Sequence, residues 1–286
     1  MRALPLAAAL GVALAVGSVL VAGRAQGARK AATAETVKAV PLRADAVKRL
    51  RSGDPAEIQS ALDDVRISAK GGVAAVPAIV ELIGRGVSPT LTQAAIDTLA
   101  DIESEGASAA LSWYARHRNV VLRRAAIQAL ARTRGPAAIK ALRLGLTDPD
   151  PAVRGSSATG LGTMKAKEAI GDLFLALDHK VAESSAAIGR ICAGDECDKL
   201  AAKLGSFPFE VVTSGLDQAL FRAPPDVTDD IKIKIVARVR ELGTAEANHF
   251  LHDVQVKWPK AGSAKVRQTI DQAVIATSGS PGERAP

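Results

Sequence analysis

The chain has 286 residues, of which 48% are hydrophobic and only 3% aromatic. Alanine and leucine favour helices, and runs that alternate Val, Thr or Tyr with polar residues are missing, so the sequence predicts an all-α protein and excludes a β-rich fold. Lys and Arg outnumber Asp and Glu by 37 to 30, a modest positive balance for a chain of this length.

The N-terminus has the pattern of an export signal. Met1 and Arg2 precede an apolar run from Ala3 to Ala22, and Gly23-Arg24-Ala25 forms a small-x-small cleavage motif. Residues 1–25 are therefore predicted to be a signal peptide or, because about 18 apolar residues can span a bilayer, an uncleaved membrane anchor. We expect an exported protein, periplasmic or associated with the cell envelope, that contacts the membrane only if this segment is uncleaved.

A linker, or a short helix, is predicted over residues 26–44, because an Ala-, Lys- and Thr-rich stretch shows no apolar period there. Asp54-Pro55 then has the pattern of an N-cap followed by a proline in the first turn, which predicts a helix over Glu57–Val65. Gly71-Gly72 breaks the chain before an apolar stretch that starts the next helix at Val76.

A sequence segment of the length of a helix then repeats at an offset of 31 residues. The segment from Leu122 to Leu130 aligns with segments that begin at Leu91 and Val153, and the intervening helices repeat at the same offset. The aligned columns are Leu91/Leu122/Val153, Ala95/Ala126/Ser157, Leu99/Leu130/Leu161, Leu111/Leu142/Leu173 and Ala115/Leu146/Leu177. Such a period is typical of stacked antiparallel helix pairs, each of which buries its apolar face against its neighbours.

The turn Asp148-Pro149-Asp150-Pro151, followed by Val153-Arg154, resembles the turn and second helix of HEAT repeats, most of all the short bacterial and phycobilisome-lyase type. The resemblance implies a HEAT-like α-solenoid, an αα-superhelix, over residues 45–277, with strict register over about 91–177. It also implies that Asp150 acts in the turn or as a helix cap and that Arg154 links one repeat to the next. Arg123 and Arg267 match the same arginine position, whereas Thr92 departs from it.

Beyond Leu177 the register is expected to slip, because Ala186-Ala187-Ile188-Gly189 follows its counterpart by only 27 residues. Four more helices are predicted over Phe209–Leu220, Asp230–Leu242, Ala245–Trp258 and Lys265–Ala276. Residues 278–286 are rich in Ser, Gly and Pro and predict a disordered tail.

Cys192 and Cys197 are the only cysteines. In an exported protein, an even count and a short intervening loop favour a disulfide that closes this turn. Two unpaired buried thiols are one alternative. A redox pair is another, although the spacing is not Cys-x-x-Cys and no βαβ pattern surrounds it.

The sequence carries no glycine-rich nucleotide motif, phosphate loop or nucleophile elbow, so we predict a non-catalytic protein without a cofactor. Acids such as Asp63-Asp64 are adjacent and therefore do not converge on one helical face. His249 and His252 stand one helical turn apart, a spacing that can bind a metal, but no third ligand is near. A solvated helix face without metal is predicted there.

The segment 116–167 carries eleven Lys or Arg and only two acidic residues. Its cations are expected to meet at the edges of adjacent repeats and form a partner-binding patch of Arg116, Arg118, Arg123, Arg124, Arg132, Arg134, Lys140, Arg143 and Arg154. The alternative is a solvated face whose arginines cover apolar surface and offset helix dipoles. An acidic protein fits the patch best and an anionic envelope component is the second candidate. Nucleic acid is disfavoured because no aromatic residues interleave with the cations.

Together these features predict a non-catalytic exported scaffold that binds a protein partner in the cell envelope. The rival hypothesis is a lyase- or chaperone-like protein that handles a chromophore or cofactor, because phycobilisome lyases share the repeat. The low aromatic content disfavours this rival, since ring-bearing ligands usually need apolar aromatic walls.

Overall fold

The computed structural model describes residues 41–102 and 104–279, without the side chains of residues 69 and 70. These residues belong to one compact unit, Ala39–Pro286. The predicted signal or anchor segment, most of the linker and residues 280–286 of the tail lie outside the described residues. None of the helices within the described ranges is long and apolar enough to cross a membrane.

The described part of the chain is helical and has no strand, only an isolated bridge between Leu204 and Phe207. Its helices are α1 (Ala46–Leu50), α2 (Pro55–Ser68), η1 (Ala69–Ala75), α3 (Val76–Gly84), α4 (Pro89–Asp101), α5 (Glu105–Tyr114), α6 (Val120–Leu130), α7 (Pro136–Gly145), α8 (Pro151–Thr163), η2 (Lys167–Ala169), α9 (Ile170–Asp178), α10 (Glu183–Ile191), α11 (Asp195–Ala201), α12 (Phe209–Leu220), α13 (Asp229–Glu241), α14 (Ala245–Lys257) and α15 (Ala264–Thr277). The four helices predicted after residue 200 agree with α12 to α15 within one residue at each end.

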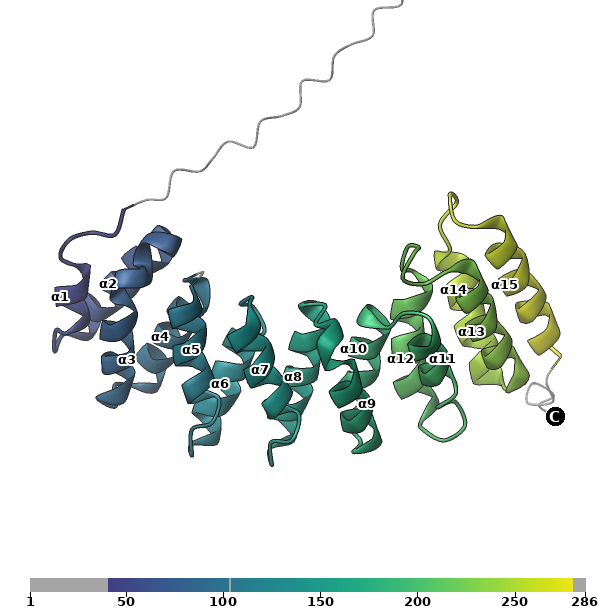
Figure 1. The fold of residues 1–286 in the computed structure, drawn as a ribbon, viewed down its shortest axis with the longest axis horizontal. Coiled ribbons are helices and arrows are strands. Elements are labelled where there is room, and N and C mark those ends of the chain that lie inside the picture. Colours follow the sequence, from purple (N-terminus) through teal and green to yellow (C-terminus); the bar gives the residue numbers. More distant parts are fainter. Residues whose placement is uncertain (1–40, 103, 280–286) are drawn as a thin grey trace, which may run out of the picture. The chain divides into compact units, whose positions relative to one another are not determined.

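The helices form two rows (Figure 1). Even-numbered helices from α2 to α12 each contact the next even-numbered helix, and odd-numbered helices pair with them. Among the odd-numbered helices, α1, α3, α5 and α7 contact one another in succession, as do α11, α13 and α15. The predicted columns form the core between the rows. Their fully buried members include Ala95, Ala126, Ser157, Leu99, Leu130, Leu161, Leu111, Leu142 and Leu173. The expectation of an all-α solenoid of stacked helix pairs is confirmed.

The break in register lies one helix pair later than expected. Ser184, Ile188 and Cys192 stand 31 residues after the column residues of α8, and all three are fully buried. The offset changes to 28 only between α10 and α12, where Val212 and Leu216 take the first two columns. The short α11, with seven residues, accounts for this shortening of the repeat. Ser184 and Cys192 occupy columns where the earlier repeats have valine or leucine. The apolar pattern therefore aligned Ala186-Ala187-Ile188-Gly189 with the earlier repeats in the wrong register.

Glycines let α8, α10 and α12 pack closely. A Cβ added to Gly189 would lie 2.0 Å from the carbonyl oxygen of Gly215, and one added to Gly215 would lie 2.3 Å from that of Ser185. A Cβ at Gly162 would lie 2.7 Å from the Cα of Ala187. The backbones therefore meet where any side chain would hold the helices apart.

Candidate interaction surface

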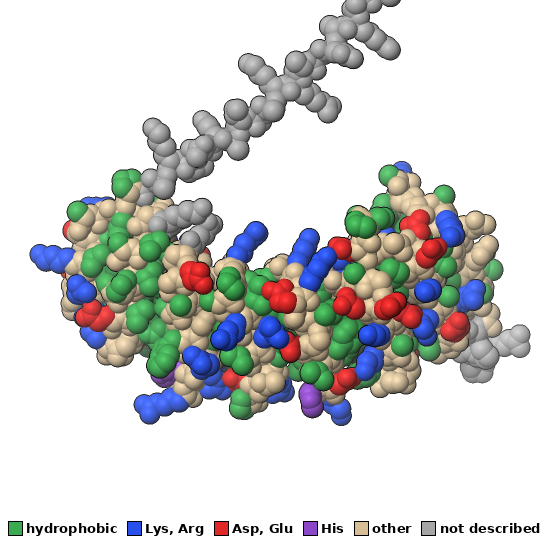
Figure 2. All heavy atoms as spheres, viewed as in Figure 1, with side chains coloured by type: hydrophobic (Ala, Val, Ile, Leu, Met, Phe, Trp, Pro, Cys, Tyr) green, Lys and Arg blue, Asp and Glu red, His purple; other side chains and the backbone are tan. Residues whose placement is uncertain are grey.

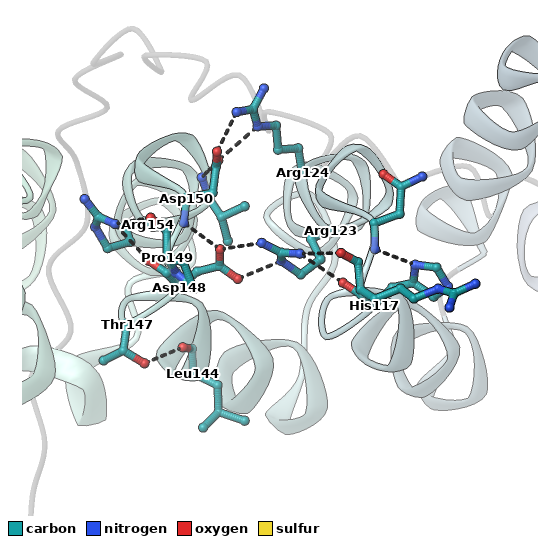
Figure 3. Close-up of polar contacts among 12 residues, drawn as sticks. His117, Arg123, Arg124, Leu144, Thr147, Asp148, Pro149, Asp150 and Arg154 are labelled. Carbon is teal, nitrogen blue, oxygen red and sulfur yellow. Dashed lines mark hydrogen bonds and ion pairs between the residues drawn. The ribbon is translucent and has the colours of Figure 1, made fainter.

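Arg123 connects the turn between α5 and α6 to the turn between α7 and α8 (Figure 3). Its Nε and Nη2 donate to the two carboxylate oxygens of Asp148 at 2.9 and 3.0 Å. Its Nη1 donates to the carbonyl oxygens of His117 and Arg118, both at 3.1 Å. Because a bidentate arginine–carboxylate pair fixes both distance and orientation, this side chain holds two successive units in register.

Asp150 caps α8, as predicted, and also binds the preceding unit. Its Oδ1 accepts a hydrogen bond from the backbone N–H of Val153 at 3.1 Å. Arg124 donates to both of its carboxylate oxygens, at 2.9 and 2.5 Å. The hydrogen bond from Arg124, together with those from backbone N–H groups, lowers the pKa of Asp150 to about 2.

Arg154 does not link its repeat to the next one, so that prediction is wrong. Its Nη1 donates to the carbonyl oxygens of Asp148 and Pro149 at 2.8 and 3.0 Å, within its own turn. The residue 31 positions after Asp148 is His179, which offers no carboxylate for a link to the next unit. Arg267 makes the same kind of bond to the carbonyl oxygens of Trp258 and Pro259, in the turn after α14.

Two more arginines of the predicted patch bind carboxylates of neighbouring units. Arg132 lies 2.6 Å from Asp97, and Arg143 lies 2.5 Å from Asp172. Sequence reasoning missed these partners and those of Arg123 and Arg124, because each carboxylate stands 25 to 35 residues away.

The cations left over do not form one patch. Among the described residues, none bonds to the side chains of Arg116, Arg118, Arg134 or Lys140. Arg116 and Arg118 lie at the turn before α6, whereas Arg134 lies at the opposite end of that helix and lines a cavity of about 650 Å³ with Asp101. The antiparallel pairing thus separates cations that are close in sequence. In Figure 2 basic and acidic side chains intermingle over the visible face.

An exposed apolar row runs along the odd-numbered helices. Trp113 of α5, Leu144 of α7 and Leu175 of α9 have 67%, 53% and 61% of their surface exposed. They are spaced by 31 residues and each follows a buried leucine column by two positions, which rotates it about 200° away from the core. The ion pair between Arg143 and Asp172 joins α7 to α9 beside this row.

Sequence reasoning missed the exposed apolar row, although the same 31-residue period contains it. The signal was an apolar residue on the outer face of a helix in three successive units. Single exposed apolar residues are common, but a repeated row of them on one surface indicates an interaction site.

An open groove of about 670 Å³ lies between α9, which contains the last residue of the row, and α11 of the unit that follows it. Phe174, next to Leu175 in sequence, and Phe207 provide its apolar lining, and Lys199 and Lys203 provide its positive charge. Lys203 lies over the ring of Phe207, 5.3 Å from the centroid, and pairs with Asp178 at 2.5 Å. The surface from α5 to α11 therefore combines apolar and basic character.

The other candidate residues are structural or solvated. Cys192 and Cys197 are joined by a disulfide between the end of α10 and the first turn of α11, with both residues fully buried. His249 and His252 are exposed on α14. Within the described residues no group of three His, Cys, Asp or Glu side chains is placed to hold a metal ion.

Comparison with known proteins supports the repeat. A family model for HEAT repeats matches residues 108–189, which span α5 to α10 apart from the first three residues of α5 and the last two of α10. A search of curated proteins found no match.

Solved structures similar to this chain include the following three. The complex of CpcE and CpcF of phycocyanin lyase from Nostoc sp. PCC7120 shares 16% identity over 81% of this chain and 93% of that one, with a TM-score of 0.42. Human deoxyhypusine hydroxylase shares 14% sequence identity over 82% of this chain and 94% of its own, with a TM-score of 0.39. A designed armadillo repeat protein shares 18% sequence identity over 82% of this chain and 98% of its own, with a TM-score of 0.37. From its own helix pairs and the family match, the chain is an all-α HEAT-like solenoid.

Proposed function

We propose that this protein is a non-catalytic scaffold that binds a segment of another protein along the exposed apolar row. The observation that carries the proposal is the repetition of an exposed apolar side chain, Trp113, Leu144 and Leu175, in three successive units. Adjacent helices in such an array lie about 10 Å apart, so a partner with regularly spaced apolar residues can contact all three units at once.

Charge indicates the chemistry of the partner. Arg116 stands one helical turn after Trp113, and Lys140 stands one turn before Leu144. Neither has a carboxylate partner among the described residues, and Lys199 in the groove between α9 and α11 has none either. Acidic residues that flank the apolar side chains of the partner would neutralise these cations and speed association.

The predicted site of action, the cell envelope, rests on the sequence of residues 1–25. An exported location also agrees with a disulfide between Cys192 and Cys197, since such bonds persist in oxidising compartments. We therefore propose that the scaffold acts after export, either free in the periplasm or held by its N-terminal segment.

Site-specific photo-crosslinking in the native host tests the proposal. A photoreactive amino acid placed at Leu144 should capture a defined partner, and one placed at Ile275, which is 74% exposed on α15, should not. Exchange of Trp113 or Leu175 for Ser should weaken this capture at least about fivefold, because an apolar contact in an interface contributes roughly 1 kcal/mol or more. The mass of the captured chain shows whether the N-terminal segment has been cleaved.

Charge reversal provides the second arm of the same experiment. Arg116→Glu with Lys140→Glu should reduce capture and its dependence on salt, whereas Lys260→Glu, at an exposed position in the turn after α14, should not. Equal capture by all variants, or equal crosslinking from Leu144 and Ile275, would refute the assignment of this surface.

A further inference from the structure

A second, more basic site lies at the ends of α8, α10 and α12. A pocket of about 460 Å³ is lined there by four cations, Lys165, Lys167, Arg190 and Arg222, and by a single carboxylate, Asp226. These residues come from three successive units. The pocket lies at the opposite ends of the helices from the Arg123 network, because successive turns of an antiparallel array alternate between its two edges.

The hydrogen bonds inside the pocket leave donors in excess. Asp226 accepts hydrogen bonds from Lys167 and Arg222, both at 2.9 Å, and Arg190 Nε donates to Gln218 at 3.1 Å. Arg222 also donates to the carbonyl oxygens of Gly189 and Cys192. The two Nη groups of Arg190, the ammonium of Lys165 and two protons of Lys167 have no acceptor among the described residues.

The charge in the pocket is also unbalanced. Asp226 neutralises one of four cations, and the hydrogen bonds from Lys167 and Arg222 keep its pKa below the usual value, so it stays ionised at neutral pH. A net charge of about +3 remains among groups that line one small space.

We propose that this pocket binds a compact oxyanion, with a phosphate group as the preferred ligand. A phosphate dianion presents several acceptor oxygens, which match the free donors of Arg190, Lys165 and Lys167. Arg222 is already hydrogen-bonded to the carbonyl oxygens of Gly189 and Cys192, so it contributes positive charge and holds the wall of the pocket in place. The site shares no residue with the exposed apolar row, and its occupancy is independent of the proposed scaffold function.

The two lysines with positive φ provide a matched pair of variants. Lys165 and Lys180 each follow a helix in left-handed conformation, with φ of 54° and 64°. Asparagine tolerates this conformation, so Lys165→Asn and Lys180→Asn remove the same charge from similar backbone positions. Only Lys165 lines the pocket.

The experiment is calorimetric titration of the purified full chain with inorganic phosphate at low ionic strength. Saturable binding is expected, weaker by about fivefold or more in Lys165→Asn and in Arg190→Gln, and unchanged in Lys180→Asn. Competition by acetate would show that a carboxylate group can occupy the same site, and failure to compete would show preference for phosphate. Circular dichroism checks that each variant is folded. If Arg190→Gln does not fold, the comparison of Lys165→Asn with Lys180→Asn is sufficient to test the proposal.

Absence of saturable phosphate binding by the folded wild-type chain would overturn the proposal. So would equal loss of affinity in Lys165→Asn and Lys180→Asn, since that result would mean that phosphate responds only to the net charge of the protein.

Discussion

Asp150 illustrates how single side chains join neighbouring units of this protein. It caps α8 through a backbone N–H and, on its other side, accepts two hydrogen bonds from Arg124 in the preceding unit. Asn119, 31 residues earlier, caps α6 through Val121 but has no arginine bound to it. The capping position is thus common to both units, while the ionic link depends on the carboxylate.

Exchange of Asp150 for Asn should separate these two roles, because asparagine also caps helices well. The folded-state pKa of Asp150, about 2, lies below its ordinary value of 3.8. The ionised carboxylate therefore stabilises the fold above about pH 4, and this contribution is lost as the pH falls through about 2. Asp150→Asn should lower the melting temperature at pH 7 and differ little from the wild type near pH 2.

Thermal unfolding at pH 7, 4 and 2 measures the effect. Asp253→Asn, at an exposed position on α14, is the control and should match the wild type at each pH. A melting-temperature difference for Asp150→Asn that does not change with pH would show that the lost charge is not the cause.

The contacts between helices depend on glycine at particular positions of the even-numbered row. Gly215 of α12 is predicted to tolerate no side chain, because its Cβ would lie 2.3 Å from the carbonyl oxygen of Ser185 and 2.7 Å from Leu200 Cδ2. Gly215→Ala should therefore destabilise the protein by about 3 kcal/mol, the upper part of the range for overpacked sites. Denaturant unfolding measures this loss.

Gly84→Ala is the matched control. Gly84 ends α3, and a Cβ there would meet no atom within 4 Å. Alanine should raise the free energy of unfolding by up to about 1 kcal/mol, since it restricts the unfolded chain without a clash. Destabilisation by both substitutions would contradict the steric explanation.

The sequence predicted the helices of this protein well because their signal is local. Buried columns at a spacing of 31 residues, Asp-Pro turns and capping residues identify most elements, and α12 has the bounds that the pattern predicted. The position of the register break was not predictable in the same way. Ser184 in α10 and Cys192 just after this helix are fully buried, although a serine is not a typical core residue at such a column.

The candidate site was harder to predict than the fold. Whether Arg123 or Arg143 is free depends on Asp148 and Asp172, which only the stacking of units brings close. Five of the nine cations in the predicted basic patch thus form hydrogen bonds or ion pairs within the array. The pocket of Lys165, Arg190 and Arg222 could not be read from the sequence because its residues come from three units.

At the scale of the whole array, each unit contacts only its neighbours, so stability should vary along the chain. The helices α8, α10 and α12 combine close backbone packing with the disulfide at the end of α10. By contrast, α1 has five residues, and α15 makes its main contacts with α13 and α14. The array should therefore be most stable at its centre and open first at its ends.

Native-state hydrogen exchange tests this gradient. After correction for intrinsic rates, amides of α10 should exchange on the order of 100-fold more slowly than those of α1 and α15, because terminal helices open without unfolding their neighbours. Gly215→Ala should speed exchange in α10 and α12 more than in α4, because the disturbance weakens with each unit that separates a helix from the substituted one. Uniform protection along the chain, or an equal effect of Gly215→Ala on α4 and α10, would instead indicate that the array unfolds as a single cooperative unit.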